Sequence, residues 1–315
     1  RFRRLVKSFK EKGLLSVIHS NSGKSPPNKT NERVVNQIVS LYRGRYRGLN
    51  LVHFIEKLKD HNIKAPSYGT IRSILLKAKL IDPKIKKKKR SYARRQRYES
   101  EGLMVQIDGS HHRWIHGMLP ICLTIAVDDA SGRIVGGKFS GTETTFAAMD
   151  VVEQVLLKEG VFQILYSDKA GIYGGGTRDG FSNMNRAMEE LGILSLQANT
   201  PQAKGRVERM FRTLQSRLIC EMRLKDIGGI EEANDYLLKE FIPKFNDQFA
   251  ITPKCREASY IKLDESINLN EILCMVTQRI VSAGQVVSYE NAKYVLDAEE
   301  SLSLIHISEP TRPIR

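Results

Sequence analysis

Three acidic residues, Asp108, Asp168 and Glu208, stand in sequence settings that could bring them to one site. Asp108 ends an alternating apolar run and Asp168 ends a short apolar run, so both should lie at strand ends. Glu208 lies inside a segment with a strong helix signal. Oxygen ligands suit hard divalent cations such as Mg²⁺ or Mn²⁺. Two such ions can activate a water and stabilise the leaving oxygen of a phosphodiester. The first hypothesis is therefore metal-dependent cutting and joining of DNA, with these carboxylates as catalytic and metal-binding groups.

The helix expected to carry Glu208 has its own start signal, because Thr200 can act as N-cap and Pro201 follows at the first helical position. Four apolar residues at helical spacing predict its buried stripe: Val207, Phe211, Leu214 and Leu218. Glu208 follows the first of these and lies about 100° round from it, at the edge of the stripe. Lys204 and Arg212 flank Glu208 at i−4 and i+4. They could hold DNA phosphates or simply neutralise Glu208, and we favour the phosphate role.

From residue 103 the apolar pattern changes from helical to alternating spacing. It predicts three antiparallel strands and then alternating helices and strands, in the order strands 103–107, 121–127 and 133–140, helix 142–158, strand 162–167, helix 182–191, strand 193–197 and the long helix from 201. Such an order predicts an α/β fold, a mixed five-stranded sheet covered by helices. It is similar to the ribonuclease-H-like fold.

Other polar residues near these strands are interpreted as structural. The carboxylates in this group are Asp128, Asp129, Asp150 and Asp179, of which the first two fit a turn cap. Three histidines, His111, His112 and His116, could suggest zinc. We expect them in a loop that packs near Trp114, because the sequence offers no fourth ligand.

Positive charge is concentrated at the beginning of the chain. Residues 1–99 hold 27 Lys and Arg against 6 Asp and Glu, whereas the whole chain has a net charge of +15. Helical spacing predicts a helix near 31–42, a second at 52–62 and a third after a tight turn. This order fits a helix-turn-helix module whose last helix would present Ser67, Tyr68, Thr70 and Arg72 to the major groove of DNA. An ordinary three-helix bundle is the alternative, but the concentrated charge favours DNA binding.

A basic run follows these helices. Residues 84–97 include nine basic residues, among them Lys86, Lys87, Lys88, Lys89 and Arg90. Such a run is usually a solvated linker, and beside a DNA-binding module it would also follow phosphates.

Composition excludes several classes of protein. No apolar run approaches the roughly 20 residues needed to span a bilayer, so no membrane partner is expected. The four cysteines are scattered, which argues against a disulfide framework or a zinc site. We expect a cytoplasmic bacterial protein that is associated with the nucleoid when bound to DNA.

Several segments resemble one known family. Residues 106–110, 201–209 and 245–249, with His112 and Trp114, resemble insertion-sequence transposases of the DDE type with an integrase catalytic core. These belong to the retroviral-integrase superfamily, and the likeness is greatest to the ISNCY group. The resemblance extends to about residue 297 and is most specific around Glu208.

This resemblance implies a ribonuclease-H-like core in which Asp108, Asp168 and Glu208 bind two Mg²⁺ ions. It implies that the enzyme nicks element ends and passes the freed 3′-hydroxyl to target DNA. The partners would be double-stranded DNA, at terminal repeats and target, and further copies of the chain in a homo-oligomer. A ribonuclease-H-like nuclease and a DNA-binding repressor from a decayed transposase remain as alternatives.

These observations predict four parts of the chain. Residues 1–98 form a helix-turn-helix region with a basic linker that lacks its first helices, and 99–250 form the catalytic core. Residues 251–300 form a small β-rich domain, a β-barrel with a hairpin between 286–289 and 293–296, and 301–315 are a non-native tail.

Overall fold

The computed structural model describes residues 2–17, 22, 29–83, 96–168, 182–198, 205–277, 279–282, 286–289, 291–295 and 308–309. The chain forms two compact units, Arg1–Lys87 and Lys88–Arg315. No helix in these ranges is both long enough and apolar enough to cross a bilayer.

The first unit is helical, as predicted. Helix α1 (Phe2–Lys12) continues into a 3₁₀ turn, η1 (Gly13–Val17), and buries no residue. Helices α2 (Glu32–Arg43), α3 (Leu51–Lys59) and α4 (Tyr68–Lys77) each begin after a side chain that accepts a hydrogen bond from a backbone N–H in the first turn. They pack around a shared core of Ile38, Tyr42, Phe54, Leu58, Ile71 and Leu75. The connection from α3 to α4, residues 60–67, is longer than the turn of about 3–4 residues that a strict helix-turn-helix uses.

The second unit is built on a five-stranded sheet in the order β3-β2-β1-β4-β5. The strands are β1 (Met104–His112), β2 (Ile121–Asp128), β3 (Ile134–Ser140), β4 (Ile164–Ser167) and β5 (Leu194–Gln197). Strands β1, β2 and β3 pair antiparallel, whereas β4 is parallel to both β1 and β5. This is the mixed sheet that the alternating pattern predicted, with the strand order of a ribonuclease-H-like core.

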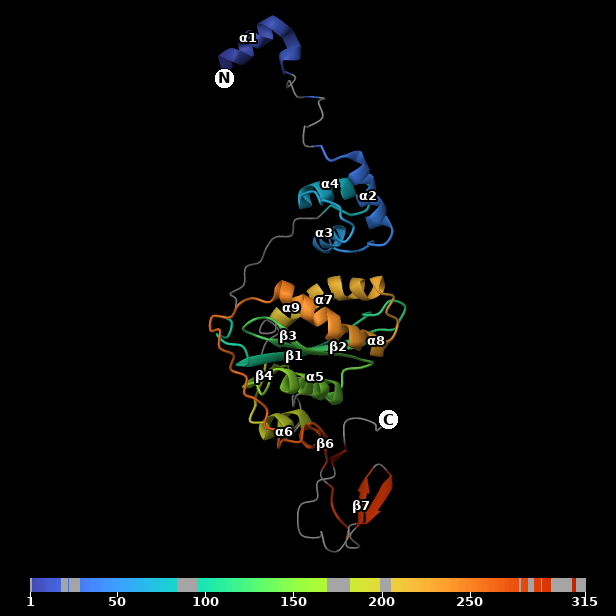
Figure 1. The fold of residues 1–315 in the computed structure, drawn as a ribbon, viewed down its shortest axis with the longest axis vertical. Helices are drawn as coiled ribbons and strands as arrows, with labels where there is room; N and C mark the ends of the chain where they lie inside the picture. Colours follow the sequence, from blue (N-terminus) through green and yellow to red (C-terminus); the bar gives the residue numbers. More distant parts are fainter. Residues whose placement is uncertain are drawn as a thin grey trace. The chain divides into compact units, whose positions relative to one another are not determined.

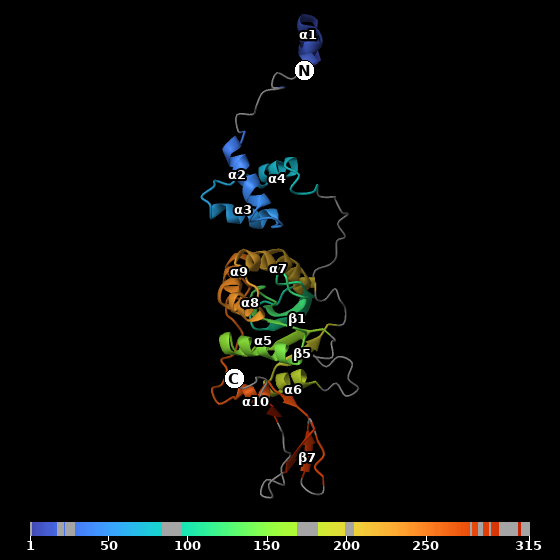
Figure 2. The same ribbon diagram turned by 90° about the vertical axis from the view of Figure 1, so that its right-hand side faces the viewer.

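Helices cover both faces of this sheet (Figures 1 and 2). One face carries α7 (Gly205–Leu224), α8 (Ile230–Tyr236), a π-helical turn η4 (Leu237–Phe241) and α9 (Ile242–Phe249). The other face carries α5 (Thr145–Lys158) and α6 (Asn183–Glu190). A Cβ atom at Gly136 of β3 would lie 2.8 Å from the carbonyl oxygen of Val151, so glycine is needed for the close approach of α5.

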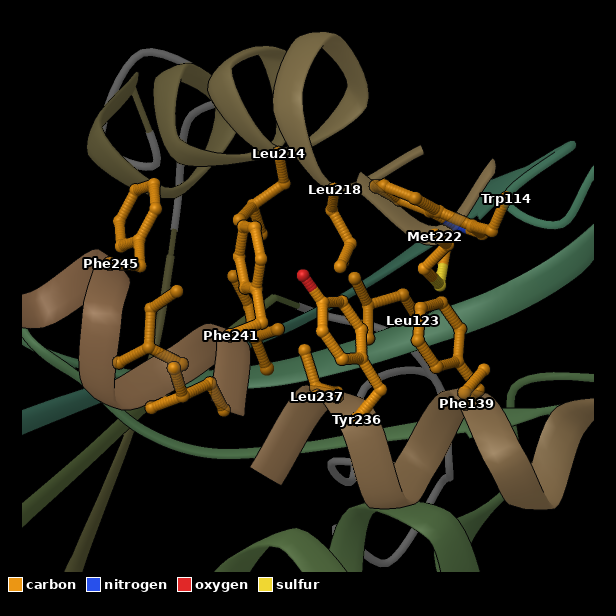
Figure 3. Close-up of a cluster of buried hydrophobic side chains, with 14 of the residues drawn as sticks. Trp114, Leu123, Phe139, Leu214, Leu218, Met222, Tyr236, Leu237, Phe241 and Phe245 are labelled. Carbon is orange, nitrogen blue, oxygen red and sulfur yellow. The ribbon is translucent and has the colours of Figure 1, made fainter. Parts of the chain in front are cut away.

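The two faces have separate cores. The four residues predicted for the buried stripe of α7 all lie in the first, against β2, Trp114 and the aromatic residues of α8 to α9 (Figure 3). The second core joins β1, β4, α5 and α6 and includes Val105, Ile107 and Leu165. Because successive residues of a strand face opposite sides, the core that a residue joins shows which face it is on.

Two asparagines cover the open edge of the sheet at β3. The Asn246 side chain accepts a hydrogen bond from the Ile134 N–H and donates one to the Ile134 carbonyl, both at 2.9 Å. Asn234 does the same at Phe139, with distances of 2.6 and 3.1 Å. Each amide takes the place of a peptide group of a further strand, and so satisfies part of an edge that could otherwise pair with another chain.

The segment after α9 packs against the second core. Tyr260, Leu263 and Ile267 pack against it, and Ile261 pairs with Val161. After α10 (Leu269–Ile272), β6 (Met275–Val276) pairs with β9 (Ser308–Glu309), and β7 (Val286–Tyr289) with β8 (Ala292–Val295). The β7–β8 pair confirms the predicted hairpin. In place of the predicted barrel, the described residues of this region form two separate two-stranded sheets.

Candidate active site

Asp108 lies in the middle of β1 and not at its end as predicted, whereas Asp168 directly follows the last residue of β4, as predicted. Gln106 of β1 is level with Tyr166 of β4, and each aspartate stands two residues further along its strand direction. If that register continued for two more residues, Asp168 would stand beside Asp108. Both carboxylates are half-buried. The pairing of β1 with β4 brings together the two segments that contain these residues, which are 60 positions apart in the sequence.

The face on which Asp108 lies follows from its antiparallel partner. Asp108 is directly opposite Ile125, which belongs to the core beneath α7. Directly opposite residues share a face, so Asp108 is on the α7 side of the sheet. Glu208 lies in the first described turn of α7, and this helix contacts β1. The side chain of Glu208 is exposed, next to the buried Val207.

The three carboxylates do not form a set whose ligand oxygens all lie within 4.8 Å of one another. In the described part of the chain, that criterion is met by His111, Cys122 and Glu143 instead. A single-ion site would need such closeness, but a two-ion site does not. Two ions about 4 Å apart, each about 2 Å from its oxygens, can be held by carboxylates up to about 8 Å apart. Joint metal binding by Asp108, Asp168 and Glu208 stays a prediction.

A polar network connects the beginning of α7 to the sheet. Arg206, two residues before Glu208, forms an ion pair with the fully buried carboxylate of Asp129. Gln106 also donates to this carboxylate, and the Tyr98 N–H donates to it at 3.0 Å. The sequence indicated a turn cap at Asp129 and no role for Arg206. This partly buried ion pair ties the part of α7 that carries Glu208 to the end of β2.

The neighbouring Asp128 is structural, as predicted. Its carboxylate accepts hydrogen bonds from the backbone N–H groups of Ser131 and Gly102, both at 2.9 Å. Burial raises the pKa of Asp128 above its ordinary value, against the effect of these hydrogen bonds. Asp150 of α5 pairs with Lys138 of β3, which also supports the structural interpretation.

The histidines differ from their predicted placement. His111 and His112 belong to β1 and not to a loop, because β2 continues the pairing up to them. His112 packs edge-on against Trp114, with ring centroids 5.6 Å apart, as expected. His111 lies on the other face, beside Cys122. Sequence inspection grouped the three histidines with each other and missed the cysteine, which is close to them only in the folded sheet.

Comparison with known proteins places this geometry in a family. The chain is 33% identical over 305 residues to a Sinorhizobium fredii protein that carries a transposase name, y4bF. It is 29% identical over 331 aligned positions to the transposase for insertion sequence IS1202 of Streptococcus pneumoniae. These matches cover 95% and 91% of the chain, and 66% and 70% of the two relatives. The chain belongs to the transposases. The resemblance stated from its motifs is thereby confirmed.

Solved structures that align with this transposase chain are distant from it. No family model matches it. A chain of a simian T-cell lymphotropic virus intasome aligns with 63% of this chain. The alignment covers 66% of the intasome chain, with 16% sequence identity and a TM-score of 0.39. The HTLV-2 integrase catalytic core domain, in complex with magnesium, aligns with 44% of this chain. The alignment covers 84% of the integrase domain, with 16% sequence identity and a TM-score of 0.36.

In the helical unit of the transposase, α4 has the predicted N-cap. Ser67 accepts a hydrogen bond from the Thr70 N–H at 3.3 Å, and the two hydroxyls lie 3.0 Å apart. Ile71 and Leu75 are buried, Tyr68 is exposed, and Arg72 is half-buried. The Ser67 and Thr70 hydroxyls therefore serve the helix start, and of the other two predicted DNA contacts Tyr68 is the more exposed.

Several predicted residues lie outside the described part of the chain. These are Lys86 to Arg90, Asp179, Thr200, Pro201 and Lys204. Arg212 is described and is exposed on α7, one helical turn after Glu208.

Proposed function

We propose that this chain is the catalytic and DNA-binding part of a DNA transposase. It would bind the ends of a mobile element, hydrolyse a phosphodiester there, and join the freed 3′-hydroxyl to target DNA. The observation that supports the proposal is the parallel pairing of β1 with β4, because Asp168 would stand level with Asp108, on the α7 side, if the register continued past the end of β4. The likeness to transposases over 95% of the chain supports it independently.

The metal-binding residues in this proposal are Asp108, Asp168 and Glu208. The donor set fits Mg²⁺ or Mn²⁺, because every ligand is a carboxylate oxygen and none is a thiolate or imidazole. Two bound ions would supply Lewis-acid stabilisation of the attacking and leaving oxygens of the phosphodiester. Strand β1 carries Asp108, the end of β4 carries Asp168, and the Arg206–Asp129 ion pair holds the start of α7. Arg206 is thus a positioning residue.

The remaining proposed contacts are with DNA. Arg212 is exposed on the helix that carries Glu208 and would hold a backbone phosphate beside the metal ions, as would Lys204. Helix α4 would enter a major groove with Tyr68 and Arg72, and the run Lys86–Arg90 would follow the phosphates. Binding of two element ends would use at least two copies of the chain, so the proposed assembly is a homo-oligomer on double-stranded DNA.

The test uses labelled DNA from either side of the gene, which should contain the element ends. Wild-type chain with Mg²⁺ should nick these ends and join them to a target plasmid. Asp108→Asn, Asp168→Asn and Glu208→Gln should each lower joining by at least about 10²-fold, the usual cost of removing one group that stabilises transition-state charge. End binding in a mobility-shift assay should stay close to that of the wild type.

Asp235→Asn is the matched control, because Asp235 is an exposed carboxylate on α8 that pairs with Lys239. It should join DNA normally. Near-normal joining by one of the three variants would remove that residue from the site. Cutting without joining and without preference for the ends would indicate a nuclease, and end binding without any nicking would indicate a repressor.

A further inference from the structure

A second group of metal-ligating side chains lies near the end of β1, beyond Asp108. His111 is near the end of β1, Cys122 is directly opposite it on β2, and Glu143 precedes α5. One imidazole nitrogen, the thiol sulfur and one carboxylate oxygen all lie within 4.8 Å of one another. Cys122 is fully buried, Glu143 is half-buried and His111 is exposed, so the group is open on one side.

This group is separate from the proposed catalytic carboxylates. Opposite residues such as His111 and Cys122 share a face, and that face also carries the Ile107–Ala126 pair, which lies in the core beneath α5. Asp108 faces the other way, toward α7. Asp108 and the His111–Cys122 pair therefore lie on opposite faces of the sheet.

The backbone near this group leaves room for the carboxylate. A Cβ atom at Gly109 would lie 2.7 Å from Glu143 Oε1 and 3.2 Å from Cys122 Sγ. Any larger residue would push Glu143 away from the thiol. The absence of a side chain at position 109 thus lets a residue from outside the sheet reach across β1 to Cys122.

A buried hydroxyl gives an independent sign that the group is built for a ligand. Thr124, directly opposite Gly109, is 1% exposed, and among the described residues its Oγ1 has no hydrogen-bond partner of normal geometry. It lies close enough to the Cys122 thiol to lower the pKa of that thiol. A buried polar atom without a partner is costly and calls for an explanation. A thiolate or a metal-bound water at this place would accept the Thr124 hydrogen.

We propose that His111, Cys122 and Glu143 bind one Zn²⁺ ion. Thiolate sulfur at about 2.3 Å and imidazole nitrogen and carboxylate oxygen at about 2.0–2.2 Å are the usual zinc ligands. Three such ligands leave a fourth tetrahedral position, which water would fill. Mg²⁺ demands oxygen ligands, so the two faces of β1 would select different metals.

Zinc binding requires the thiolate, and the metal-free thiol is protonated at neutral pH. Burial, with the nearby carboxylate of Glu143, raises the pKa of Cys122 to about 11. Binding therefore releases the thiol proton to solvent as the sulfur–metal bond forms. The bound ion would link β1, β2 and the segment before α5, three residues along the strand from Asp108.

The experiment uses the full chain, freed of metal with a chelator and kept in a phosphine reductant. Co²⁺ is titrated as a coloured substitute for Zn²⁺, with excess Mg²⁺ present to compete for the catalytic carboxylates. We expect one equivalent of Co²⁺ to give the near-ultraviolet charge-transfer band of a thiolate–cobalt bond, and Zn²⁺ to displace it. Cys122→Ser should lose this band, and Glu143→Gln should weaken binding by about tenfold or more.

Matched variants separate this site from others. Cys220→Ser removes a half-buried cysteine on α7, and His112→Gln removes the neighbouring imidazole, and both should keep the band. Asp108→Asn should also keep it, so that failure of the proposed catalytic site leaves this result unchanged. Absence of the band in the wild type, its persistence in Cys122→Ser, or unchanged affinity in Glu143→Gln would overturn the proposal. Far-ultraviolet circular dichroism checks that each variant is folded.

Discussion

Replacing Asn246 with alanine should lower the free energy of unfolding of the Lys88–Arg315 unit by about 2–4 kcal/mol. The change removes two hydrogen bonds of 2.9 Å to Ile134, a residue whose side chain is fully buried in the edge strand β3. Leaving a buried donor or acceptor without a partner costs about 1–3 kcal/mol, and here one of each is left. The expected loss is smaller than the largest sum of these two penalties, because Asn246 is half-buried and water can reach part of the space that its side chain leaves.

The assay can be limited to this unit because the chain has a single tryptophan. Trp114 is fully buried in the core beneath α7, with ring centroids 6.0 Å from Phe139 and 6.3 Å from Phe211. Its fluorescence in a urea titration therefore reports unfolding of the sheet unit and not of the helical unit. The urea midpoint should fall at an unchanged slope.

Three further variants test the reasoning. Asn246→Asp keeps the acceptor for the Ile134 N–H but sets a carboxylate against the Ile134 carbonyl, so its stability should fall as well. Asn234→Ala should act at the other end of β3, and the double variant should be additive because the two sites share no partner. Asn270→Ala, at an exposed position on α10, should change stability by less than about 0.5 kcal/mol. If Asn246→Ala lowered the free energy of unfolding no more than Asn270→Ala does, the role of Asn246 at the edge strand would be refuted.

Two other predictions concern charge. Changing Lys86–Arg90 to Gln should weaken DNA binding irrespective of sequence, and should reduce the slope of log affinity against log salt by about 0.9 for each phosphate that the run no longer neutralises. An unchanged slope in a salt titration would make the run a spacer. In chelator, the wild type should lose stability as pH rises from 9 to about 11, because burial raises the pKa of Cys122 from 9.0 to about 11, and the unfolded chain releases this proton first. Cys122→Ala should show less of that loss in urea midpoints measured across the range, and parallel curves would contradict the assignment.

The strands and helices of the sheet unit could be predicted because their apolar spacing reflects burial on one or both faces. The stripe from Val207 to Leu218 and the three antiparallel strands are examples, and the structure confirms them. Apolar spacing predicts the first and last residues of an element less closely than it predicts the element itself. α5 begins at Thr145 after the N-cap Thr144, three residues later than the apolar pattern indicated, because the cap hydrogen bond to the Ala147 N–H decides where the helix starts.

Contacts between distant segments could not be read from spacing. Asn246 lies in a segment whose likeness to a family was noted, but its partner Ile134 is 112 positions away. The Arg206–Asp129 ion pair is a second such contact. The sequence explains Arg206 as an ordinary helix residue and Asp129 as an ordinary turn residue, so neither indicates the other as its partner. Glu143 reaches Cys122 only because Gly109 has no side chain. These interactions depend on the packing of the elements, which the local pattern does not encode.

The position of Asp108 depends on two strand pairings at once, and this makes the geometry of β1 unusually well determined. β1 pairs with β2 on one side and with β4 on the other. A slip of one residue against either neighbour would move Val105 and Ile107 out of the α5 core and turn Asp108 away from α7. The same slip would bring His111 to the α7 face and away from Glu143. Burial of two alternate apolar residues therefore fixes the faces on which Asp108 and His111 lie, which is why one residue of each proposed metal site can stand three positions apart on the same strand without interfering.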